Sequence, residues 1–96
     1  MFNVVEVNDH ELKLSGRLDA VEVPKAQPVF DRLTSSTILD CQDLGYISSA
    51  GLGLLISTQL RLGKSGGGLK LTKVAKFVRD VLRYSGLDKI FEIEEN

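Results

Sequence analysis

Cysteine, histidine and tryptophan are nearly absent from this chain of 96 residues, which contains one Cys, one His and no Trp. One Cys cannot form an internal disulfide bond, which argues against a disulfide-stabilised secreted domain and fits a reducing cytoplasm. One His and one Cys also leave almost no ligands for a His/Cys metal site, so we expect no metal and no cofactor. The sequence therefore predicts a small cytoplasmic protein with few catalytic groups.

An excess of charge of one sign is also missing. Twelve Lys and Arg against thirteen Asp and Glu give a net charge of −1, without the basic surplus of a nucleic-acid-binding domain. The longest apolar stretch, residues 50–56, is far shorter than the roughly 20 residues that a membrane span needs. Residues 1–6 lack the basic and apolar regions of a signal peptide. We expect neither direct nucleic-acid binding nor membrane insertion.

What is present is an alternation of strand and helix patterns over a chain long enough for one core, so we treat residues 1–96 as a single domain. The expected strands span residues 2–7, 11–19, 37–41, 69–72 and 91–93. The expected helices span residues 25–34, 50–63 and 74–85. This order, ββαβαβαβ, predicts an α/β fold with a mixed sheet and helical crossovers.

Asp19 and Glu22 have the spacing of a capping box before the first helix. Residues 43–45 read as a loop after the short apolar strand 37–41. On the helix over 50–63, a set of residues at helical spacing predicts the buried stripe: Leu52, Leu55, Ile56, Gln59 and Leu60. Leu54 and Leu62 lie off that stripe. They either stay partly exposed, as on a docking helix, or widen the buried face.

Groups that could support catalysis are few. Cys41 has no His placed to activate it, so we expect a small core residue. His10 falls at the tip of the expected hairpin, where water surrounds it. Asp40 and Asp43 could form a carboxylate pair, but turn and capping roles explain both. We expect a protein that is not an enzyme and has no catalytic residue of its own.

Ser48 and Ser49 stand where a buried strand meets the start of a helix. Either serine can serve as the N-cap of that helix. The backbone N–H groups and the dipole of a helix N-terminus also favour negative charge, so a phosphate can be held there. Residues 48–49 therefore have two readings, a plain cap or a phosphorylated serine.

Four segments together resemble the STAS domain of bacterial anti-sigma factor antagonists, over essentially the whole chain. They are Gly-Arg-Leu-Asp at 16–19, Ile-Leu-Asp at 38–40, Ile-Ser-Ser-Ala-Gly-Leu-Gly at 47–53, and Tyr-Ser-Gly-Leu-Asp-Lys-Ile-Phe at 84–91. The family's phosphorylated serine usually lies in an Asp-Ser-Ser/Thr-Gly-Leu-Gly run. Registered on residues 51–53, it corresponds to Ser49, with Ser48 as the second choice. Ser48 stands where the family has Asp, and Ala50 replaces the second hydroxyl.

The resemblance implies a binding protein controlled by phosphorylation. The unmodified protein would bind an anti-sigma factor that is also a serine kinase, and so release a sigma factor; a serine phosphatase would reverse the modification. The residues expected to contact the partner are Asp19, Asp40, Ser48, Ser49, Gly51 and Leu54. The loss of Asp at position 48 leaves an alternative open, a non-switching STAS subunit of a regulatory assembly or a membrane lipid-transporter complex.

Overall fold

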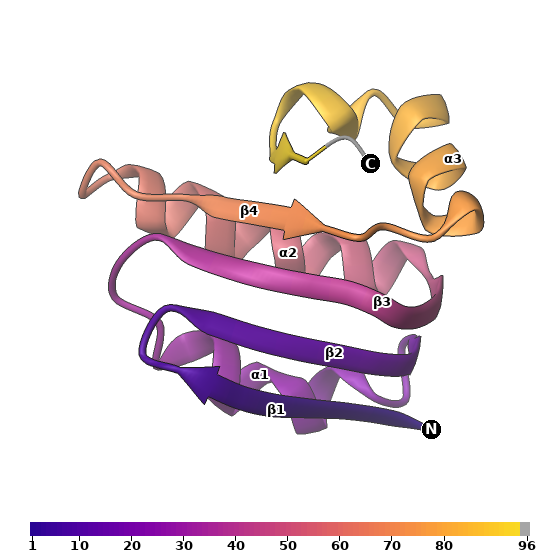
Figure 1. Cartoon of the computed structure of the whole chain (residues 1–96), viewed down its shortest axis with the longest axis horizontal. Helices are drawn as coiled ribbons and strands as arrows, with labels where there is room; N and C mark the ends of the chain where they lie inside the picture. Colours follow the sequence, from indigo (N-terminus) through magenta and orange to yellow (C-terminus); the bar gives the residue numbers. More distant parts are fainter. Residues whose placement is uncertain (95–96) are drawn as a thin grey trace.

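A five-stranded mixed sheet in the order β1-β2-β3-β4-β5 forms the centre of the protein (Figure 1). The computed structural model describes residues 1–94. Their elements are β1 (Phe2–Asn8), β2 (Glu11–Leu18), α1 (Val23–Asp31), β3 (Thr37–Ile47), α2 (Ser49–Gly63), β4 (Leu69–Thr72), α3 (Lys76–Tyr84), the 3-10 turn η1 (Leu87–Lys89) and β5 (Glu92–Ile93). β1 pairs antiparallel with β2, and β2 to β5 are parallel neighbours. The predicted α/β fold and its element order are confirmed.

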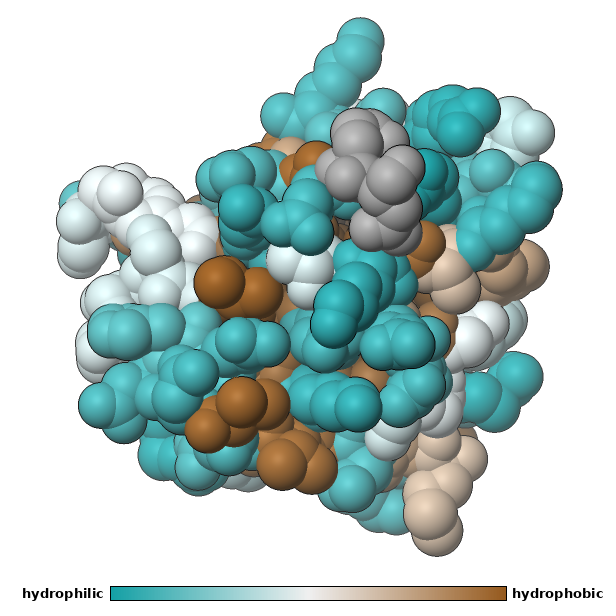
Figure 2. Space-filling view, viewed as in Figure 1, coloured by the Kyte–Doolittle hydropathy of each residue, from teal (hydrophilic) through white to brown (hydrophobic). Residues whose placement is uncertain are grey.

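Helices α1 and α2 lie side by side on one face of the sheet (Figure 1). The guanidinium of Arg61 on α2 ties them, because it donates to the carbonyl oxygens of Leu33 and Phe30 at 2.7 and 2.8 Å. The core between this helical layer and the sheet contains Phe30, Leu39 and other fully buried side chains. The opposite face is largely hydrophilic, with a few apolar patches (Figure 2). Among residues 1–94, no helix is both long and apolar enough to cross a membrane.

Strand β3 is longer than the sequence predicts. Residues 43–45, expected in a loop, continue the strand, and Asp43 and Leu44 are the Cα partners of Ser15 and Gly16 on β2. Leu44 is buried, and its burial stabilises the pairing of β3 with β2 here, although Asp43 and Gly45 favour turns locally. Two register shifts between β2 and β3 accommodate the irregular segment. The predicted loop is therefore wrong, and β3 carries the chain to Ile47 in one run.

The capping box before α1 forms only in part. Asp19 Oδ1 accepts hydrogen bonds from the backbone N–H groups of Val21 and Glu22, both at 3.1 Å. The carboxylate of Glu22 does not return to Asp19 and instead accepts the N–H of Phe2 at 3.2 Å. Helix α1 itself begins at Val23, two residues before its predicted start, because Pro24 fits the first turn, where its missing N–H is not needed.

The buried face of α2 differs from the predicted stripe. Leu54 and Leu62 are 4% and 2% exposed, whereas Leu60 is 62% exposed. The sheet covers one side of α2 and α1 covers another, so the buried arc is wide and excludes Leu60. Of the two readings for Leu54 and Leu62, the wider buried face is the one observed.

Candidate functional site

The N-terminus of α2 lies at the carboxyl ends of β2 and β3, which are parallel and so finish at the same edge of the sheet. Leu18 and Ile47, the last residues of these strands, are Cα partners. The chain then turns into α2 through Ser48, whose backbone N–H donates to the carbonyl oxygen of Leu18 at 3.0 Å. This places Asp19, Ser48 and Ser49 at one end of the sheet, although residues 19 and 48 are far apart in the sequence.

The hydroxyl of Ser48 is committed to the backbone. It accepts the N–H of Gly51 at 3.3 Å and donates to the carbonyl oxygen of Leu18 at 3.5 Å. Ser48 has extended backbone angles and precedes the first helical residue, so it is the N-cap of α2. One of the two predicted caps is thus the observed one, and its oxygen faces the protein.

Ser49 is the first residue of α2, and its side chain is exposed. Within the part of the chain that the structure describes, its hydroxyl makes no hydrogen bond. The first N–H groups of a helix have no partner within the helix, and they carry the positive end of its dipole. Ser49 therefore offers an accessible alcohol at a position that favours an added negative charge.

Gly51 brings α2 against the end of β2. A Cβ atom on Gly51 would lie 2.5 Å from the carbonyl oxygen of Leu18 and 2.8 Å from Cγ1 of Ile47. Gly53, one half-turn further along, is exposed and has open space around its Cα. Gly51 is buried, so it has no exposed surface for a partner to contact. Its role is to let α2 approach β2 and so to position Ser48 and Ser49.

A cluster on the face of the sheet opposite α1 and α2 borders this junction. We call Arg17, Asp19, Tyr46 and Phe77 the Arg17 cluster. Arg17 and Tyr46 are Cα partners, and the Arg17 Cζ atom lies 4.0 Å from the centre of the Tyr46 ring. Tyr46 stacks on Phe77 of α3 with ring centres 5.6 Å apart, and Arg17 Nε lies 3.9 Å from Asp19 Oδ2. The cluster connects β2, β3 and α3 beside the serine-bearing turn.

Asp40 and Asp43 do not belong to this junction. Asp40 lies seven residues before Ile47 in β3, which is about 20 Å of strand. Its carboxylate accepts the N–H of Gln42 at 3.0 Å and lies 3.7 Å from Lys73 Nζ, while Asp43 pairs with Lys13 at 3.5 Å. Because β3 is extended here, the two acids serve separate ion pairs. Asp40, one of the residues predicted to contact a partner, therefore lies apart from Ser48 and Ser49.

The exposed side of α2 runs from the serine toward the middle of the helix. Gly53, Ser57 and Leu60 are exposed on it, and Ile56 is half-buried. Leu54, expected to contact a partner, faces the core instead. The sequence reading therefore missed Leu60, and it missed Arg17, Tyr46 and Phe77. Strand alternation opposite Leu18 and Ile47 was the available signal for Arg17 and Tyr46.

Cys41 is fully buried in β3. Burial, and then the charge of Asp40, raise the pKa of its thiol to about 12. A thiol with such a pKa is almost entirely protonated at neutral pH, and only the thiolate is a strong nucleophile. Cys41 therefore has the properties of a small core residue.

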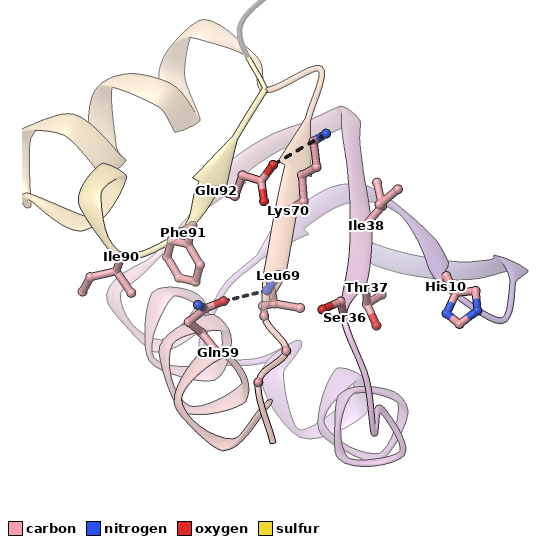
Figure 3. A pocket seen from close by; sticks show the side chains of 13 residues that line it. His10, Ser36, Thr37, Ile38, Gln59, Leu69, Lys70, Ile90, Phe91 and Glu92 are labelled. Carbon is pink, nitrogen blue, oxygen red and sulfur yellow. Dashed lines mark hydrogen bonds and ion pairs between the residues drawn. The ribbon is translucent and has the colours of Figure 1, made fainter. Parts of the chain in front are cut away.

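A hollow of about 580 Å³ lies at the opposite end of the sheet, where β3 and β4 begin (Figure 3). Gln59 Oε1 accepts the N–H of Leu69 there at 2.6 Å, and Lys70 Nζ lies 3.7 Å from Glu92 Oε2. His10 stands apart from these groups on the β1–β2 hairpin (Figure 3). The polar side chains that Figure 3 joins by dashed lines are thus already paired within the protein, and we assign the hollow no ligand.

Comparison with known proteins identifies the family of this chain. A family model described as "Mlab, STAS domain" matches residues 4–93. The anti-sigma-B factor antagonist of Bacillus subtilis (strain 168) is 28% identical over 90 residues, which are 90% of this chain and 82% of the relative. An anti-sigma factor antagonist from Mycobacterium paratuberculosis has a TM-score of 0.85 at 22% identity, over 100% of this chain and 87% of that one.

The antagonist SpoIIAA has been solved in two states. Its unphosphorylated form gives a TM-score of 0.77 at 20% identity, over 100% of this chain and 90% of that one. The phosphorylated form of SpoIIAA, from Bacillus, gives a TM-score of 0.70 at 19% identity, over 100% of this chain and 93% of that one. The chain therefore belongs to the STAS domain family, and the relatives and solved structures that it resembles are anti-sigma factor antagonists.

Proposed function

We propose that this STAS domain is an anti-sigma factor antagonist whose binding is controlled by phosphorylation of Ser49. In the unmodified state it binds an anti-sigma factor that is also a serine kinase, and a sigma factor is released. Phosphorylation weakens the complex, and a serine phosphatase restores it. The observation that carries the proposal is the exposed, unbonded hydroxyl of Ser49 at the start of α2, next to a Ser48 hydroxyl that is already used as the cap.

The chemistry requires nothing catalytic from this chain. The kinase supplies Mg·ATP and a base, which takes the proton from Ser49 Oγ. The Ser49 oxygen forms a bond to the γ-phosphorus of ATP. The bond between the γ-phosphorus and the oxygen that bridges it to the β-phosphate breaks, and ADP leaves. In the free protein the added charge of about −1.5 to −2 is solvated, and the N-terminus of α2 stabilises it by about 0.3–1 kcal/mol.

The same charge opposes binding. The proposed docking surface consists of Ser49, Asp19 and the exposed side of α2 at Gly53, Ile56 and Leu60. A partner that covers Ser49 removes water from the phosphate, and an unpaired buried charge costs about 3 kcal/mol or more. That cost corresponds to a complex more than about 100-fold weaker.

Two observations support the proposal from outside the chain. The Bacillus subtilis relative is named an anti-sigma-B factor antagonist, and SpoIIAA has been solved in a phosphorylated form. The matched family model is described by a different member, "Mlab". Because Ser48 stands where the family has Asp, we keep a second candidate function. In that candidate the domain is a non-switching STAS subunit of a regulatory assembly or a membrane lipid-transporter complex, and Ser49 is not a kinase substrate.

The test uses the 96-residue chain and a purified anti-sigma factor with serine kinase activity, sought among the products of the neighbouring genes. After incubation with Mg·ATP, mass spectrometry should locate one phosphate on Ser49, none on Ser49→Ala, and the same yield on Ser48→Ala once folding is verified. Calorimetry should give a Kd more than 100-fold higher for the phosphorylated protein. A phosphate on Ser48, or none from a kinase that binds, would contradict the assignment; recovery of transporter subunits without a kinase from extract would favour the second candidate.

A further inference from the structure

The Arg17 cluster holds a cation that is only loosely engaged. The Arg17 side chain is 57% exposed, its guanidinium lies over the Tyr46 ring, and its Nε is 3.9 Å from Asp19 Oδ2, near the limit of an ion pair. Asp19 is fixed by its other oxygen, which accepts two backbone N–H groups. A guanidinium has five N–H donors. Within residues 1–94 its one charged partner is Asp19, so it has donors left for an anion.

The register of the sheet brings Arg17 within reach of Ser49. Arg17 is the Cα partner of Tyr46, and Ser49 follows Tyr46 by three residues, which span at most about 10 Å. Paired strands are about 4.8 Å apart. An extended arginine and a phosphoserine side chain together cover that separation. The contact to Asp19, which stands beside the turn at Ser48, draws the guanidinium toward the same end of the sheet.

We propose that Arg17 is the residue that responds to the modification: when Ser49 carries a phosphate, the guanidinium leaves the Tyr46 ring and pairs with the phosphate. The proposal rests on Ser49 as the modified residue. Arginine matches the oxygens of a phosphate with two parallel hydrogen bonds, and such charge-assisted pairs are stronger than an exposed contact to an aromatic face. The pair also offsets the repulsion between the phosphate and Asp19.

The exchange of partners changes the protein in two places. At Ser49 it pairs the phosphate in the free protein, so a partner that covers the site must remove water from both charges or separate them. At Tyr46 it uncovers one face of a ring whose other face stacks on Phe77 of α3. A change at the serine is thereby passed along the sheet surface to α3 by side chains alone.

The experiment introduces phosphoserine at position 49 during translation, so no kinase is needed. The second pKa of a phosphoserine is about 6 and can be followed by ³¹P NMR across pH 4–9. In the otherwise unaltered protein it should be lower by about half a unit than in Arg17→Gln, since an exposed ion pair is worth fractions of a unit. Arg17→Lys, which keeps the charge but not the two parallel hydrogen bonds, should keep only part of the shift. The Arg17 Nε–Hε signal should move as the phosphate ionises.

Lys25→Gln is the matched control, because Lys25 is an exposed cation on the first turn of α1, paired with Glu22 at 3.7 Å. It should leave the phosphoserine pKa unchanged. An equal pKa in the unaltered protein and Arg17→Gln, or an equal effect of Lys25→Gln, would overturn the proposal. Because the phosphate is installed without a kinase, the two proposals can fail separately. A kinase that does not phosphorylate Ser49 would refute the proposed function without changing this measurement. An unchanged phosphoserine pKa in Arg17→Gln would refute the role of Arg17 without refuting phosphorylation of Ser49.

Discussion

The close approach of α2 to β2 at Gly51 makes a prediction with an internal control. Gly51→Ala places a methyl group 2.5 Å from the Leu18 carbonyl oxygen and 2.8 Å from Ile47 Cγ1, both well inside contact distance. Gly53→Ala makes the same chemical change in the same helix, where nothing lies within 4 Å. The two variants therefore separate packing from helix propensity.

The magnitudes follow from these contacts. Replacing Gly by Ala inside a helix gains about 1 kcal/mol from propensity. At Gly51 the obstacle is backbone, which cannot rotate away, so the overpacking cost of about 1–3 kcal/mol falls at its upper end and the net loss is about 1–2 kcal/mol. At Gly53 the propensity gain stands alone, about 0.5–1 kcal/mol.

Thermal unfolding followed by far-UV circular dichroism suits a chain without Trp. For a domain of this size, each kcal/mol moves Tm by about 4–8 °C. Gly51→Ala should melt roughly 5–15 °C lower, and Gly53→Ala a few degrees higher. Equal shifts, or a stabilised Gly51→Ala, would show that the helix can retreat from β2 at no cost, and the account of how Ser49 is positioned would fail.

Two further predictions concern single side chains. Ser48→Ala should lose about 1 kcal/mol of unfolding free energy, because the N–H of Gly51 loses its acceptor, whereas Ser49→Ala should change it by less than about 0.5 kcal/mol; a larger loss at Ser49 in urea titrations would reverse the roles of the two serines. Cys41, whose pKa burial raises to about 12, should react with a thiol reagent at pH 8 about a thousandfold more slowly in the native protein than in the unfolded chain, whose thiols have a pKa near 8.5. Fast native labelling, read by mass spectrometry, would show that the core around β3 opens.

Sequence reasoning succeeded where one local signal decides the outcome. Strand alternation, the glycines and the amphipathic helices sufficed for the element order, and they limited the N-cap of α2 to Ser48 or Ser49, of which Ser48 is observed. It failed at residues 43–45, because Asp and Gly favour turns locally while pairing with β2 decides the strand. On α2, leucines occupy so many positions that the hydrophobic pattern does not show which of them are buried. Leu54, placed off the predicted stripe, is buried, and Leu60, placed on it, is exposed.

The Arg17 cluster needed information that one sequence does not contain. Arg17 and Tyr46 meet because β2 and β3 are parallel in one particular register, interrupted by two shifts. If one of the two strands slipped by one residue, its side chains would turn to the other face, and Arg17 would no longer lie over Tyr46. The sequence alone therefore does not predict the residues nearest the serine-bearing turn, because the long-range pairing of β2 with β3 brings them together.

The bond from Phe2 to Glu22 has a consequence for the free edge of the sheet. The N–H of Arg17 donates to the carbonyl oxygen of Met1, and antiparallel pairs alternate, so the even-numbered residues of β1 point their N–H and C=O groups away from β2. Glu22 occupies the first of these N–H groups, and a bulge after Glu6 disturbs the far end. Val4 and Glu6 keep both outward groups in regular register, and Phe2 keeps its outward C=O, so the stretch open to another strand is short. A side chain at the start of α1 thus shortens the part of the β1 edge that could pair with a strand of another molecule.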